Sequence, residues 1–243
     1  MRRLADHGAV TTVTHSQPTE PEQAKPRKAF YWHRYLRADG TWIRPVESNG
    51  PPGEELAALR SGLGHPAGSV MALWPYYATE TDGELTSELI AEHGALTLYG
   101  LHQQGQRRPM HRRDMNLGAA LRRLRDSEKF LDSALDRRVE AAATTTSVDA
   151  LLYRLRGLVT QLRGQGVPLD YDQLVRDLRQ WPYAERRQWV RRRWGLAYYA
   201  RGGQDGQGNQ GGRGDQGGPD NDARGTAPTA PSAPDNTQAP SGN

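Results

Sequence analysis

The stretch DALLYRLRGLVTQLR, residues Asp149 to Arg163, decides the fold class of this 243-residue chain. Its apolar side chains recur every three or four residues, which is the period of one face of an α-helix. Ser147 stands where it can cap the first turn, and Gly164 and Gly166 stand where the helix should end. The sequence therefore predicts an amphipathic helix with buried Leu151, Leu152, Leu155, Leu158, Val159 and Leu162.

The same spacing recurs from Phe30 to Arg201, and no run of alternating β-branched residues competes with it. Only Thr41 to Val46 could form a short strand. The sequence predicts an all-α fold made of two small helical sub-bundles, residues 30–143 and 144–201. The other expected helices cover residues 54–63, 85–102, 117–124, 132–143, 168–181 and 184–200.

Three local details accompany these helices. Gly64 is expected to end the first helix, and Ser69 is expected to cap a short piece that Pro75 bends or stops. The helix at residues 85–102 carries apolar side chains around most of its circumference, so we expect it to be largely buried.

The two ends of the chain are too polar to fold. Residues 1–29 contain three prolines, and residues 202–243 contain no aromatic residue and no aliphatic one larger than alanine. Neither segment can bury enough apolar surface to offset the entropy of ordering, so both are expected to be disordered extensions. No cysteine is present, and no apolar stretch approaches the ~20 residues needed to cross a bilayer. We expect a soluble cytoplasmic protein with no membrane partner.

Charge divides the foldable region into two unequal parts. Residues 30–103 hold 4 basic and 9 acidic side chains (4 − 9 = −5), whereas residues 104–201 hold 21 basic and 11 acidic ones (21 − 11 = +10). A folded surface with a large positive excess attracts phosphate, so the second part indicates nucleic-acid binding. Any single arginine can equally belong to a solvated ion pair, and only the ensemble argues for a polyanionic partner.

Other chemistry is not indicated. Of the seven histidines, none shows the spacing of a metal site on a helix, and His111 reads as part of a basic loop. No glycine-rich phosphate-binding loop is present, and no carboxylate is singled out as a general acid. We therefore expect no metal, no cofactor and no catalysis. Tyr153 and Trp189 adjoin arginines and could stack on bases, although core packing is the expected role of most aromatic residues here.

Six segments follow one another in a distinctive order: LAALRSGLGHPAGSVMALWPYY (56–77), HGALTLYGLHQQ (93–104), HRRDMNLGAALRRL (111–124), DRRVEAA (136–142), LLYRLRGLVTQLRGQGVPLDYDQLVRDL (151–178) and RRQWVRRRWGLAYY (186–199). Together they cover most of residues 30–201. In this order they resemble the CasB family, the small subunit of type I-E CRISPR Cascade complexes.

The resemblance implies an all-α, non-catalytic subunit, present as two copies in an RNA-guided surveillance complex. Its implied partners are the backbone-forming subunits, the large subunit, a second copy of itself, crRNA and target DNA. Its basic surface would hold the target and displaced strands of the R-loop. The positions that would carry this role are Arg137, Arg138, Arg154 and Arg156, together with Arg112, Arg186 and Arg187.

Two other functions remain open from the residues alone. Helices joined by short turns, such as residues 149–181, could form a helix-turn-helix of a free-standing DNA-binding regulator. The arginines could instead make only protein contacts in a pure scaffold. In the complex that the resemblance implies, the acidic first part, including Glu54 and Glu55, is expected to face protein neighbours.

Overall fold

The computed structural model describes residues 28–43, 50–127 and 132–200. The sequence-based expectations for residues 1–27, 44–49 and 202–243 lie outside this range. Within it the chain is helical and contains no β-strand, which confirms the all-α prediction. Two isolated bridges join Leu36 to Trp42 and His111 to Leu169, so the described end of the possible strand at 41–46 forms a bridge only. Every helix in these residues is too short or too polar to span a bilayer.

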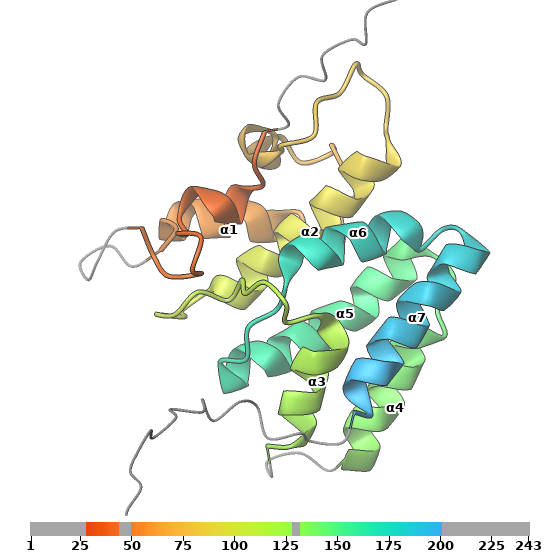
Figure 1. Cartoon of the computed structure of the whole chain (residues 1–243). Helices are drawn as coiled ribbons and strands as arrows, with labels where there is room; N and C mark the ends of the chain where they lie inside the picture. The colour runs from red at the N-terminus through yellow and green to blue at the C-terminus, as the bar shows by residue number, and fades with distance from the viewer. Residues whose placement is uncertain (1–27, 44–49, 128–131, 201–243) are drawn as a thin grey trace, which may run out of the picture. The chain divides into compact units, whose positions relative to one another are not determined.

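Figure 1 shows how the elements are arranged. Their bounds, in chain order, are η1 (Tyr31–Arg34), α1 (Gly53–Ser61), η2 (Met71–Tyr76), α2 (Ser87–Gln103), α3 (Leu117–Arg125), α4 (Asp132–Ala143), α5 (Val148–Gln165), α6 (Tyr171–Gln180) and α7 (Ala184–Tyr198).

Helix α2 is central to one group of helices and packs against α1, α5 and α6. Nearly all of its residues from Leu89 onward are buried, as the sequence predicts. Glycines permit the close approaches: a methyl group at Gly100 would lie 2.6 Å from Leu59 of α1, and one at Gly94 would lie 2.7 Å from Leu152 of α5. Larger residues at these two positions would force the helices apart.

Helices α3, α4, α5 and α7 pack around a second group of buried side chains. Trp181 and Trp194 stack there with ring centroids 5.1 Å apart. The core is continuous, because one cluster includes Leu96 of α2, Leu155 of α5 and Trp194 of α7. The division at residue 143 into two helical regions stays a prediction.

Helix ends agree with the sequence at α5 and differ at two other places. Ser147 Oγ accepts the Ala150 N–H, and Gly166, with φ +62°, ends α5, whereas Gly164 still lies within it. Helix α1 ends at Ser61 with Gly62 as its C-cap, two residues before the expected Gly64. Ser69 does not cap η2: its hydroxyl donates to the Pro66 carbonyl oxygen 2.7 Å away, because this short 3₁₀ turn begins only after Val70.

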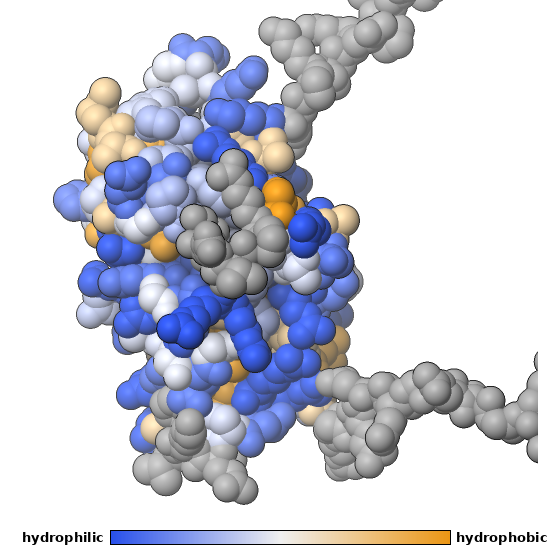
Figure 2. All heavy atoms as spheres, turned by 90° about the vertical axis from the view of Figure 1, so that its left-hand side faces the viewer, coloured by the Kyte–Doolittle hydropathy of each residue, from blue (hydrophilic) through white to orange (hydrophobic). Residues whose placement is uncertain are grey.

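Hydrophilic side chains cover much of the face seen in Figure 2, and hydrophobic ones appear on it only in scattered patches. Large apolar side chains that are nevertheless exposed include Met71, Tyr153, Trp189, Leu196 and Tyr199.

Candidate nucleic-acid interface

Helices α4 and α5 lie side by side and bring three predicted arginines together. On α4, Leu135 and Ala142 face the core, and Arg137 and Arg138 lie on the exposed flank. On α5, Leu155 is buried and the preceding Arg154 is exposed. The buried positions therefore orient both helices so that these arginines border one groove.

The groove between these helices has a volume of about 620 Å³. Three of the lining residues are small, namely Ala134, Ala141 and Gly157, and their side chains leave space between the two helices. We call it the α4–α5 groove, and it is lined by Ala134, Arg137, Arg138, Ala141, Tyr153, Arg154, Gly157, Leu158 and Gln161.

The three groove arginines keep their charge available. In residues 28–43, 50–127 and 133–200, no carboxylate lies within ion-pair distance of Arg137, Arg138 or Arg154. All three residues are exposed, two on α4 and one on α5. Three unpaired positive charges around one hollow produce a local potential that attracts phosphate.

Arg156 and Arg112 are exposed but do not line this groove. Arg156 follows Arg154 by two residues, which is about 200° around the helix. Leu152, one turn before Arg156, packs on Gly94, so this flank of α5 faces α2. Arg112 stands in the loop before α3, where its N–H donates to the Leu169 carbonyl oxygen at 3.1 Å.

Arg186 and Arg187 have different surroundings although they are neighbours at the start of α7. Arg186 is exposed, and its guanidinium carbon lies 4.9 Å from the centroid of the Tyr183 ring. Arg187 instead donates to the carbonyl oxygens of Trp181 at 2.8 Å and Thr146 at 3.2 Å. Arg187 therefore joins the α6–α7 turn to the α4–α5 turn, a role that the sequence does not reveal.

Two further arginines of α7 also have partners inside the fold. Arg191 donates to the Thr145 carbonyl oxygen at 2.7 Å, and Arg193 forms an ion pair with the buried Asp177. Trp194 donates its indole N–H to the same carboxylate at 2.7 Å. The positive excess of this part of the sequence thus overstates the charge that faces solvent.

Tyr153 and Trp189 do not pack in the core, contrary to the role expected for most aromatic residues. Tyr153 is 75% exposed and Trp189 is 65% exposed. Arginine side chains adjoin both rings, with Arg154 5.9 Å from the Tyr153 centroid and Arg192 5.1 Å from the Trp189 centroid. Their helical phase explains the exposure, because each lies opposite the buried stripe of its helix.

The interpretation of His111 as part of a basic loop is wrong. Its side chain is only 3% exposed and contacts the Trp32 ring, with centroids 5.8 Å apart. Its Nδ1 accepts the Tyr171 N–H at 3.1 Å. Burial lowers the pKa of His111 to about 4, against the opposing effect of the nearby Asp172 carboxylate. His111 is therefore neutral at physiological pH.

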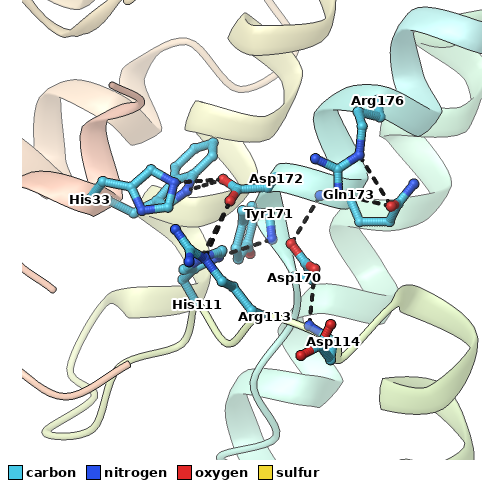
Figure 3. A network of polar contacts seen from close by, with 10 residues as sticks. His33, His111, Arg113, Asp114, Asp170, Tyr171, Asp172, Gln173 and Arg176 are labelled. Carbon is cyan, nitrogen blue, oxygen red and sulfur yellow. Dashed lines mark hydrogen bonds and ion pairs between the residues drawn. The ribbon is translucent and has the colours of Figure 1, made fainter. Parts of the chain in front are cut away.

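Around His111, a polar network ties η1 to the first turn of α6 (Figure 3). Asp172 Oδ1 accepts the Trp32 indole N–H and contacts His33 Nε2, each at 2.8 Å. Burial tends to raise the pKa of Asp172, but the hydrogen bonds from His33 and Trp32 outweigh it and hold the pKa below its usual range. The network stabilises the junction between two segments far apart in the sequence.

His33, His111 and Asp172 also lie close enough to suggest a metal site, since one ligand atom from each falls within 4.8 Å of the others. Their hydrogen bonds do not fit that role. Because His111 Nδ1 is an acceptor, the neutral ring carries its proton on Nε2, the atom that would have to bind the ion. Arg113 adds a positive charge 4.0 Å from the Asp172 carboxylate.

A larger hollow of about 720 Å³ lies beside this network. It is lined by charges of both signs, including Lys28, Arg176 and Arg179 with Glu80 and Glu88, and Arg179 is paired with Glu88 at 3.4 Å. A mixed lining of this kind does not favour a polyanion. The smaller α4–α5 groove is the better candidate for binding nucleic acid.

Comparison with known proteins agrees with this fold. The sequence profile of the CRISPR-associated protein Cse2 family matches residues 55–199. The crystal structure of CasB from Thermobifida fusca is 34% identical in sequence, with a TM-score of 0.51, and the match covers 61% of this chain and 85% of that one. A chain of a CRISPR RNA-guided surveillance complex shares the fold with 23% identity and a TM-score of 0.50, over 61% of this chain and 82% of that one. No curated protein matches the sequence.

Proposed function

The chain belongs to the CRISPR-associated Cse2 family, and on that premise we propose that it is the non-catalytic small subunit of a type I-E RNA-guided surveillance complex. One of the chains that share its fold comes from a CRISPR RNA-guided surveillance complex. In this role the subunit acts in the cytoplasm with crRNA and target DNA. Its protein partners are the backbone-forming subunits, the large subunit and a second copy of itself.

The proposed activity is binding of the nucleic-acid backbone without base readout, which stabilises the R-loop. Replacing a DNA duplex by an RNA–DNA hybrid and a free strand is nearly balanced in free energy, so a few phosphate contacts can decide the outcome. Arginine suits these contacts because its planar guanidinium can donate two parallel hydrogen bonds to one phosphate.

The observation that carries the proposal is the convergence of Arg137, Arg138 and Arg154 on one groove with no carboxylate partner in the part of the chain that the structure describes. Arg112, Arg156 and Arg186 are exposed outside the groove and would add phosphate contacts elsewhere on the subunit. Arg187 contributes mainly by holding the turns together, since its guanidinium already donates to backbone carbonyl oxygens.

The test is a reconstituted complex that contains the Arg137→Glu/Arg154→Glu double variant of this chain. We expect faster dissociation from target DNA and a shallower salt dependence, by about 0.7–0.9 log units per lost phosphate contact. The matched control is Arg60→Glu/Arg176→Glu, which changes the net charge equally on α1 and α6, outside the groove.

Two results would contradict the proposal. Equal R-loop lifetimes for the groove variant and the control would favour the pure scaffold, in which these arginines make protein contacts. A strong preference of the isolated chain for one duplex sequence would favour the free-standing regulator. The packing gives the regulator function little support, because α6 packs mainly on α2. A helix-turn-helix would require α6 to pair with α5.

A further inference from the structure

We propose that Tyr153 stacks on an unpaired base, so that the α4–α5 groove binds single-stranded nucleic acid in preference to duplex. This inference rests on the proposed function and specifies the class of ligand that the groove takes.

Tyr153 has no structural role that explains its position. Its ring is 75% exposed and lies outside the core cluster. Within the described residues its hydroxyl makes no hydrogen bond. A tyrosine ring usually stabilises a fold by burying its apolar body, and this one leaves that body in water. An aromatic face held open beside positive charges is the arrangement on which bases stack.

The neighbouring charges fit a strand whose backbone and bases are both accessible. Arg154 lies 5.9 Å from the Tyr153 ring centroid, and Arg137 and Arg138 stand on the facing helix. Phosphates can therefore bind the arginines while a base lies on the ring. In a duplex the base faces are covered by their stacked neighbours, so the arginines could bind its phosphates but Tyr153 would remain unused.

Gly157 provides space for the base. It lies one turn after Tyr153 in the middle of α5, and apart from its chain neighbours and the local helix backbone no atom lies within 4 Å of the position that a Cβ would occupy. Glycine is among the least favourable residues inside a helix, and nothing packed nearby requires it. The unoccupied space at Gly157 leaves room for a flat ring beside the Tyr153 ring.

A protein partner is the competing occupant of the groove. The lining disfavours it, because the groove holds three arginines without a carboxylate partner beside one aromatic ring, and Leu158 is the only large aliphatic residue among the lining side chains. Protein interfaces that bury an aromatic anchor usually surround it with apolar contacts and few charges. Nucleic acid supplies both the negative charge and the flat apolar surface.

The inference is tested by fluorescence anisotropy of the full chain with a labelled single-stranded oligonucleotide, its duplex, and a version that lacks bases. Tyr153→Ala should weaken binding of the single strand by about 5- to 150-fold. It should have little effect on the duplex or the abasic strand. Tyr153→Phe, which keeps the ring, should bind within about 2-fold of the unchanged protein.

A second variant separates binding from folding. Gly157→Leu fills the unoccupied space at this position, so we expect it to weaken single-strand binding. It also replaces a poor helix former by a good one, so we expect the variant to melt at a higher temperature. Such a loss of affinity could not be attributed to unfolding.

The outcomes distinguish the inference from the proposed function. If Arg137→Glu/Arg154→Glu weakens binding but Tyr153→Ala binds the single strand like the unchanged protein, the stacking role is wrong and phosphate binding stands. If the arginine variant also binds normally, or if the unchanged chain binds neither form, both proposals fail. Tyr153→Ala that binds nucleic acid normally but loses a protein subunit of the complex would identify a protein partner instead.

Discussion

Gly118 of α3 lies directly against the backbone carbonyl of Trp194 in α7, and a methyl group at position 118 would overlap that oxygen. The contact involves backbone atoms, which cannot move aside as a flexible side chain can. It fixes how closely α3 and α7 approach. It thereby also fixes the position of Trp194, whose ring stacks on that of Trp181.

Gly118→Ala should therefore destabilise the fold. Overpacking of this kind costs about 1–3 kcal/mol, and urea unfolding followed by tryptophan fluorescence would measure it. The control is Gly195→Ala, one residue from the same contact, where no atom lies within 4 Å of the new methyl group. That variant should be as stable as the original or gain up to about 1 kcal/mol, because alanine favours a helix. Equal stability of the two variants would show that the helices can separate freely.

Stability should decrease as the pH falls below about 6.5, because buried histidines resist protonation. Burial lowers the pKa of His111 to about 4 and that of His102 to about 3. Below the ordinary histidine pKa, the unfolded chain therefore binds protons that the folded chain does not. Between pH 6.5 and pH 5 each group should reduce the free energy of unfolding by about 2 kcal/mol.

The variant that tests this origin is His111→Asn, which can still accept the Tyr171 N–H but does not titrate. The loss of stability between pH 7 and pH 5, measured by denaturant unfolding, should be smaller in the variant by about 2 kcal/mol. The charged groups around His111 are Asp170, Asp172, Arg113 and His33. An unchanged pH dependence would assign the effect to other groups.

Variants of two arginines should differ in whether they lose stability or nucleic-acid affinity. Arg187→Gln removes hydrogen bonds to the Trp181 and Thr146 carbonyl oxygens, so we expect a loss of about 1–3 kcal/mol in thermal or urea unfolding. Arg138→Gln, on an exposed surface without a carboxylate partner in the described residues, should unfold like the original but bind nucleic acid less tightly. The reverse pattern would exchange the roles assigned to the two side chains.

Charge reversal at neighbouring acidic residues of α1 should have two different effects. Glu54 is exposed, so Glu54→Lys should leave the fold stable and, if this surface meets protein neighbours, weaken assembly of the complex. Glu55 accepts hydrogen bonds from the Tyr31 and Tyr35 hydroxyls at 2.5 and 2.6 Å. Glu55→Lys should destabilise the folded chain before any partner is added. Co-purification and circular dichroism, respectively, would measure the two effects.

The sequence predicted the helix positions and caps, which depend on residues close together in the chain. Leucine spacing placed α5 correctly, and Ser147 and Gly166 marked its ends because capping is local. The stripe pattern also separated exposed Arg137 and Arg154 from the buried leucines. Their convergence on one groove required the packing of α4 on α5, which a single helix does not encode.

The sequence failed where partners lie far apart along the chain. His111 is buried by Trp32 and accepts the N–H of Tyr171, which is 60 residues away. Arg191 donates to Thr145 across 46 residues, and no helical periodicity distinguishes it from an arginine that binds a ligand. Tertiary contacts of this kind decide whether a charged side chain serves the fold or faces solvent.

The hydrogen bonds from Arg187 and Arg191 to the turn between α4 and α5 should also affect the kinetics of the proposed binding. They hold the groove-forming helices in one arrangement before any ligand arrives, so association need order only side chains and not backbone. A preorganised site of this kind loses less entropy on binding. Its encounter rate with a polyanion is then set by diffusion and electrostatic attraction, and should fall as salt is added.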